Sequence, residues 1–272
     1  MSFTLITPPA PKTALWTIER GVSPIIATAI HEGHSVRPEL QSLYNLSPDQ
    51  RLREEDPFTE FTIRDVPNRI VFHRSRFEVD INRGRDGAVY QTPDQAWGLQ
   101  VWKDGLSLQC IEASLEVHDD YYDMLLTSLK GVERRHGRFV VLDVHSYNHR
   151  RDGPTAAATE QCNAPDINIG TFSMDRARWA HVVDTLVDHF RSHELNGRLL
   201  DVRENVAFQG KGEQTRFIHQ HFPLSGCAIA VEFKKIFMDE WTGEPDLNFL
   251  QQLRSMIASV VPVLERVLES SR

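Results

Sequence analysis

The sequence predicts an α/β fold in which a central β-sheet is covered by helices on both faces. Two observations lead to this class. Short apolar runs rich in β-branched residues recur along the chain, and longer stretches with helical spacing of apolar residues lie between them. With 272 residues, 40% of them hydrophobic, the chain can bury a large core without disulfide or metal support. No segment resembles a linker, so we expect a single domain over residues 1–272 with an irregular, proline-containing lead-in at 1–14.

Five apolar runs are predicted to form strands. The clearest are residues 138–144 (RFVVLDV) and 227–233 (CAIAVEF), and residues 23–30 (SPIIATAI) form a third buried strand. Residues 69–72 and 77–81 are shorter candidates. The length and apolar content of these runs indicate a sheet that is buried on both faces.

Three longer stretches are predicted to form helices, at residues 113–136, 173–193 and 247–268. Gly137 directly follows the first and suits a helix C-cap. Pro262 lies inside the third and should kink or divide it, because proline lacks the N–H that a helix interior needs.

Composition excludes several classes of protein. Lys and Arg number 30 against 38 Asp and Glu, so the formal net charge is −8, which argues against nonspecific nucleic-acid binding. No apolar run approaches the roughly 18–20 residues that span a bilayer, and the N-terminus has no secretory pattern. Three widely spaced cysteines do not form a disulfide framework. We expect a cytoplasmic protein with no membrane or nucleic-acid partner.

Polar side chains with catalytic potential follow the predicted strands. His31 ends the first strand within His-Glu-Gly-His, which is not the HExxH zinc motif because its histidines are three apart. His145 ends another strand, and strand alternation places Asp143 on the same face, where it can orient the imidazole. Ligands bind at the carboxyl ends of strands in α/β sheets, so these histidines can serve a common site.

Acidic residues elsewhere could complete such a site. Residues 53–57 (REEDP) form a charge run that is usually solvated, but Pro57 extends Asp56 and could aim its carboxylate at a metal. Glu232, on the last predicted strand, is either paired with a cation or a general base. Two histidines, an aspartate and a free glutamate would make an open zinc site with a base beside it.

A cationic segment at residues 74–85 contains four arginines in an otherwise acidic chain. Arginine binds carboxylate and phosphate in a bidentate manner, so this segment suits a small anionic ligand. Internal pairing with Glu78, Asp80 and Asp86 is the alternative, and it would neutralise much of the positive charge.

Six ordered stretches carry a resemblance to a known family. They are AIHEG at 29–33, EDP at 55–57, SRFEVDINR at 75–83, LDVHS at 142–146, PDINIGT at 165–171 and VEF at 231–233. Together they resemble the N-formylglutamate amidohydrolase family, which is similar to zinc carboxypeptidases and acyl-amino-acid deacylases. The resemblance implies a mixed central sheet flanked by helices on both faces. It also implies hydrolysis of an N-formyl or N-acyl amino acid, with N-formyl-L-glutamate giving formate and glutamate.

The resemblance also implies a catalytic centre. Zn²⁺, one per chain, would be held by His31, Asp56 and His145, although another divalent transition metal could occupy such ligands. Glu232 would activate the water, and Arg76 would serve as an electrophile or second anchor.

The expected substrate is a small anionic N-acyl amino acid, bound by a monomer or small homo-oligomer. By resemblance, Asn82 and Arg83 would hold a substrate carboxylate, Asn168 and Thr171 would line the pocket, and His221 would make a minor contact.

The chain departs from the family pattern at three places. His31 is followed by Glu-Gly-His, and Lys234-Lys235 follows the predicted base. Proline follows Asp56 where a better-known branch has tryptophan, so Glu55 could be the ligand instead. A carboxypeptidase-like peptidase and a non-catalytic anion-binding protein therefore remain alternative functions.

Overall fold

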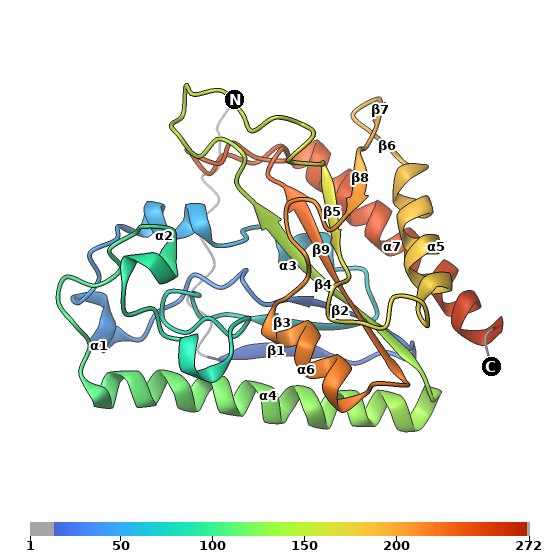
Figure 1. Ribbon diagram of the computed structural model, residues 1–272, viewed down its shortest axis with the longest axis horizontal. Coiled ribbons are helices and arrows are strands. Elements are labelled where there is room, and N and C mark those ends of the chain that lie inside the picture. Colours follow the sequence, from blue (N-terminus) through green and yellow to red (C-terminus); the bar gives the residue numbers. More distant parts are fainter. Residues whose placement is uncertain (1–13, 271–272) are drawn as a thin grey trace, which may run out of the picture.

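The computed structural model describes residues 14–270, in which seven strands form one mixed sheet (Figure 1). Across the sheet the order is β1 (Trp16–Glu19), β3 (Asn68–Phe72), β2 (Ile25–Ala29), β4 (Phe139–Tyr147), β9 (Gly226–Lys234), β5 (Ile167–Gly170) and β8 (Val202–Glu204). The neighbours β3, β2, β4 and β9 are parallel, whereas β1 is antiparallel to β3 and β5 is antiparallel to β9. The predicted α/β class with a mixed sheet is confirmed.

Helices cover both faces of this sheet (Figure 1). One face packs against α4 (Leu108–His136) and α6 (Glu213–His221). The other packs against α3 (Thr59–Thr62), α5 (Ala180–Arg191) and α7 (Leu247–Ser270). Shorter elements complete the described chain: α1 (Pro38–Gln41), α2 (Pro48–Glu54), the 3-10 turns η1 (Arg85–Gly87) and η2 (Pro93–Ala96), and the hairpin β6 (Glu194–Leu195) with β7 (Arg198–Leu199).

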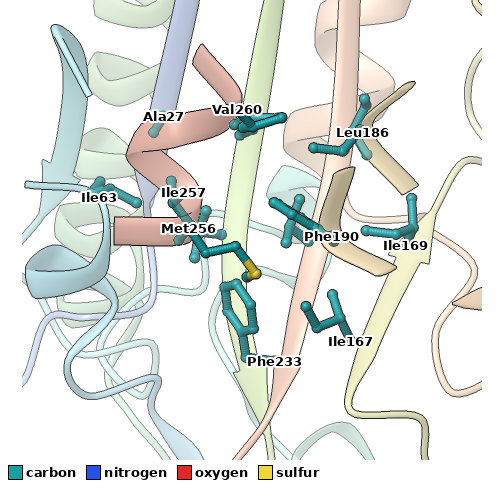
Figure 2. Packing of buried hydrophobic residues seen from close by; sticks show 14 of the residues in the cluster. Ala27, Ile63, Ile167, Ile169, Leu186, Phe190, Phe233, Met256, Ile257 and Val260 are labelled. Carbon is teal, nitrogen blue, oxygen red and sulfur yellow. The ribbon is translucent and has the colours of Figure 1, made fainter. Parts of the chain in front are cut away.

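The largest hydrophobic cluster lies between the sheet and α5 and α7. Leu186 and Phe190 from α5 and Met256 and Val260 from α7 meet strand side chains such as Phe233 (Figure 2). These side chains are at most 2% exposed, so the sheet is fixed by packing on the face opposite α4. A rigid sheet fixes the positions of side chains that project from its strand ends.

The predicted strands at 23–30, 69–72, 138–144 and 227–233 are confirmed, with ends shifted by at most three residues. The strand predicted over 77–81 is wrong. The backbone N–H groups of Glu78 and Val79 both donate to the Ser75 carbonyl, so the chain turns there. Its alternation of apolar and acidic residues resembles a half-exposed strand, but all of these side chains are buried.

The predicted helix at 113–136 is confirmed and begins earlier, at Leu108, where Ser107 caps it; Gly137 follows it with a φ of 77°. The helix predicted over 173–193 begins only at Ala180, because the chain turns through 171–179 to bury Trp179. Pro262 does not divide α7, which is stabilised by core residues on both sides of it.

Two further findings bear on the predictions. Within residues 14–270, no helix combines the length and apolar character needed to cross a bilayer. The predicted lead-in at 1–14 lies outside the described residues, apart from position 14.

Candidate metal centre and active site

Three side chains that are distant in sequence meet at the carboxyl ends of the parallel strands. His31 follows the end of β2, and His145 lies on the neighbouring strand β4. Asp56 comes from the segment after α2, where its backbone N–H donates to the His31 carbonyl across 2.9 Å. This backbone bond explains how a loop carboxylate reaches the sheet edge.

The three side chains surround a common point. Oδ2 of Asp56 lies 3.0 Å from Nδ1 of His145 and 3.4 Å from Nδ1 of His31. One potential ligand atom from each residue lies within 4.8 Å of the others, and all three side chains are buried. Two imidazoles and one carboxylate that converge in this way can hold a divalent cation and leave positions open for a substrate.

The outer nitrogen of each imidazole faces a second carboxylate. Nε2 of His31 lies 2.8 Å from Oδ1 of Asp80, and Nε2 of His145 lies 3.2 Å from Oδ2 of Asp143. A proton on Nε2, shared with the carboxylate, leaves the Nδ1 lone pair facing the other ligands. The tautomer that suits metal binding is therefore the one that these aspartates favour.

The local charge also fits a divalent cation. Five carboxylates and three cations contact the histidines or line the same cavity, and this leaves a net charge of −2 when the carboxylates are ionised and the imidazoles are neutral. They are Glu54, Asp56, Asp80, Asp143, Glu232, Arg76, Arg151 and Lys235. Burial alone would raise the pKa of the Asp56 carboxyl, but hydrogen bonds from protonated Nδ1 atoms of His145 and His31 hold its pKa well below the usual range. A divalent cation at this point would replace those protons and keep Asp56 ionised in the same way. The centre is therefore built to keep Asp56 ionised.

Glu232 lies beside this group on β9. It pairs in register with His145 of β4 on one side and with Asn168 of β5 on the other. Burial raises the pKa of Glu232 to about 7, against the opposing effect of His145. A carboxylate with a pKa near neutrality can both accept and return a proton under physiological conditions.

A cavity of about 130 Å³ opens above these residues. Its lining includes an aromatic and cationic group, which consists of Trp97, Phe208, Arg76, Arg151 and Lys235. The remaining lining residues are Glu54, Asn82, Ser146, Tyr147 and Asn148. Pockets for drug-sized ligands commonly measure about 300–1,000 Å³, so this cavity suits a smaller molecule.

Two of the residues expected to act on the substrate line the cavity, and Arg83 does not. Asn82 places Nδ2 3.4 Å from Nε2 of His145, and Arg76 pairs with Asp80 across 2.8 Å. The Arg83 side chain is 37% exposed, donates to the Gln95 carbonyl, and places Nε 3.7 Å from Oδ2 of Asp80. It lines a neighbouring surface depression that it shares with Asn82.

Asn168 and Thr171 lie beneath a loop at the cavity edge. Asn168 accepts the backbone N–H groups of Val206 and Ala207 and donates to the Phe208 carbonyl, at 2.7–2.9 Å. Thr171 accepts a hydrogen bond from the side chain of Asn205. Both residues therefore hold the loop that carries Phe208 into the cavity lining.

His221 is exposed at the end of α6. Its ring packs on the ring of Phe217, and its Nδ1 lies 2.9 Å from the backbone carbonyl oxygen of Phe217. It is outside the set of residues that line the cavity.

Glu55, the alternative to Asp56, points away from His31 and His145. Its carboxylate accepts the Ser75 hydroxyl and lies 2.5 Å from Nδ1 of His34. Glu55 therefore joins three loop segments around the site, and Asp56 is the carboxylate that reaches the histidines.

Sequence reasoning did not assign Asp80, Trp97, Arg151, Phe208 or Lys235 to this site. Asp80 was considered only as an internal partner for arginines, which it is, but it also contacts His31. Trp97 and Phe208 lie in irregular segments with no motif. Only the tertiary structure brings them to the cavity.

A mixed α/β sheet that carries a buried His–Asp–His group, with an acidic residue beside it, is typical of hydrolases that use a metal ion. The model of the N-formylglutamate amidohydrolase family matches residues 23–238. The chain therefore belongs to the N-formylglutamate amidohydrolase family, as its motifs suggested, and it is a hydrolase of that family. The search of curated proteins found no match.

Solved structures share the fold. The N-formylglutamate amidohydrolase from Ralstonia eutropha JMP134 superposes with a TM-score of 0.72 at 16% sequence identity, covering 93% of this chain and 99% of that one. A gene product from Agrobacterium tumefaciens gives a TM-score of 0.67 at 14% identity, covering 94% and 96%. At these identities the likeness establishes the architecture alone.

Proposed function

We propose that this protein hydrolyses the amide bond of an N-formyl or N-acyl amino acid, with N-formyl-L-glutamate giving formate and L-glutamate as the leading reaction. The observation that carries the proposal is the convergence of His31, Asp56 and His145 beside Glu232 in a small cavity. Family membership supports the same reaction.

We propose one zinc ion per chain, held by His31, Asp56 and His145. The facing Nδ1 atoms, the outer carboxylates and the net local charge all fit a divalent cation. Imidazole and carboxylate ligands also suit other divalent transition metals, so zinc is the first choice among several. When bound, the ion supplies Lewis-acid chemistry, which acidifies water and polarises the amide carbonyl.

Glu232 is the proton carrier in this proposal. Its carboxylate takes a proton from the attacking water and delivers it to the amide nitrogen as the C–N bond breaks. Asn82 and the Arg76 guanidinium line the same cavity, where they can donate hydrogen bonds to the oxygen that gains negative charge.

The cavity size favours a small substrate over a peptide. A peptidase needs a groove for several residues, whereas the volume of about 130 Å³ is below that of most ligand pockets. Cations at Arg76, Arg151 and Lys235 favour an anionic substrate. We also propose a cytoplasmic location, which the three free cysteines support.

Formate release from N-formyl-L-glutamate by zinc-loaded protein tests the function. We expect about one zinc per chain by elemental analysis. Glu232→Gln should retain the metal and lose activity by roughly a hundredfold or more, the range of general-base catalysis. His145→Ala should lose the metal while the protein remains folded. Full activity in Glu232→Gln, or full metal content in His145→Ala, would refute the assigned roles.

A further inference from the structure

Three cationic side chains line the cavity, and they differ in how their charges are balanced. Arg76 lies 2.8 Å from Asp80, and Arg151 lies 3.3 Å from Glu54. Lys235 has no carboxylate within ion-pair distance among residues 14–270.

Lys235 is held in place by backbone groups. Its side chain turns into the cavity at a bend that follows the end of β9. Nζ donates to the carbonyls of Arg53 and Glu55, at 2.6 and 2.7 Å. An ammonium has three hydrogens, so these two bonds leave one for the cavity.

Lys235 is nevertheless almost fully buried, at 1% exposure. A buried charge is costly unless an opposite charge or sufficient hydrogen bonds balance it. Burial lowers the pKa of Lys235 to about 8, although nearby carboxylates oppose this, so most of the population remains protonated at neutral pH. The protein thus maintains a fixed, largely desolvated positive charge that faces the cavity.

We propose that Lys235 binds a carboxylate of the substrate and thereby selects dicarboxylic N-acyl amino acids. This assignment rests on the proposed function, and it places the carboxylate contact at Lys235 instead of at Arg83, which does not line the cavity. A carboxylate in the cavity completes the third hydrogen bond of the ammonium and gives it a counter-charge within ion-pair distance.

Lys234 provides a matched control. It is also buried, at 5% exposure, but it pairs with Asp166 across 3.0 Å and donates to the Ala164 carbonyl. It is outside the set of residues that line the cavity. The two neighbouring lysines therefore differ in the feature under test, which is access of an unbalanced ammonium to the cavity.

The test measures binding of glutarate, a five-carbon dicarboxylate without an amide bond, to the zinc-loaded protein by calorimetry. We expect Lys235→Met to weaken glutarate binding by roughly ten- to a hundredfold, which is the typical loss of affinity when a hydrogen bond to a charged group is removed. Lys235→Arg should restore part of the affinity, and Lys234→Met should bind like wild type. Zinc content should be equal in all variants, because none of these lysines is a proposed ligand.

Turnover gives a second readout. With N-formyl-L-glutamate, Lys235→Met should raise KM and change kcat much less, whereas a purely structural role would lower kcat and metal content together. Equal glutarate affinity in wild type and Lys235→Met, or no glutarate binding to wild type, would overturn the assignment to Lys235. If glutarate binding depends on Lys235 but no N-formyl amino acid is hydrolysed, the proposed reaction is wrong and the carboxylate site stands.

Discussion

Asp80 connects the metal-ligand candidates to the arginine that lines the cavity. It is fully buried, and one carboxylate oxygen lies 2.8 Å from Nε2 of His31 while the other lies 2.8 Å from Nη2 of Arg76. Asp80→Asn keeps the size of the side chain and removes its charge. We expect this change to weaken both metal binding and folding.

The expected magnitudes follow from these contacts. Loss of a carboxylate behind a metal-binding imidazole typically weakens metal affinity by about 10–100-fold, which corresponds to roughly 1.4–2.7 kcal/mol. The charge of Arg76 also loses its buried partner, and breaking a buried ion pair costs about 3–5 kcal/mol of folding stability. A typical domain has about 5–15 kcal/mol in total, so most of the variant should still fold at low temperature.

Zinc affinity is measured by competition with a chromophoric chelator, and stability by urea unfolding of the metal-free protein. Asp119→Asn is the control, since Asp119 pairs with Arg85 at the surface, where both side chains are about half exposed. Zinc affinity in Asp80→Asn within twofold of wild type would refute the role of Asp80 in supporting His31. A loss of stability without a loss of zinc affinity would indicate that Asp80 acts only as a partner of arginines such as Arg76 and Arg83.

Two further predictions concern the scaffold. Burial lowers the pKa of His219 to about 4, and its Nε2 accepts the Ala228 N–H, which an imidazolium cannot do. The unfolded chain binds this proton at a pKa near 6.5, so the stabilisation present above pH 6.5 should be lost as the pH falls to about 4, by about 3 kcal/mol. Urea unfolding at pH 7 and pH 4.5 should therefore give His219→Gln a flatter pH dependence than wild type; parallel profiles would contradict this. Gly33→Ala should lower the free energy of unfolding by roughly 1–3 kcal/mol and weaken zinc binding, because the added alanine Cβ would lie 2.3 Å from the backbone of His73. A melting temperature equal to that of wild type would contradict this.

The pattern of apolar residues predicted those strands and helices whose conformation depends mainly on their own residues. The apolar runs on β2, β4 and β9 are buried along almost their whole length, and such runs have few alternatives to a central strand. The strand prediction for residues 77–81 is wrong because the acidic side chains of this segment are buried against partners from elsewhere in the chain. Asp80 meets His31, and Glu78 accepts the backbone N–H of Arg37.

The candidate site also contains residues that the sequence could indicate and a side-chain arrangement that only the structure shows. The family resemblance pointed to His31, Asp56, His145 and Glu232, and the strand-end argument supported the two histidines, because a strand end fixes where such a side chain projects. The choice between Asp56 and Glu55 stayed open, since adjacent residues in an extended loop differ only in the direction of their side chains. In the structure Asp56 lies beside His31 and His145, whereas Ser75 and His34 hold the Glu55 carboxylate away from these two histidines.

The sequence by itself determined the α/β class, the main strands and the set of chemically capable side chains, since these depend on periodicity and residue type over short distances. The tertiary structure alone decided that Asp80 supports His31, that Arg83 lies outside the cavity lining, and that Lys235 presents its charge to the cavity. These outcomes depend on which distant groups balance a buried charge. Such balance arises only when segments far apart in the chain pack together.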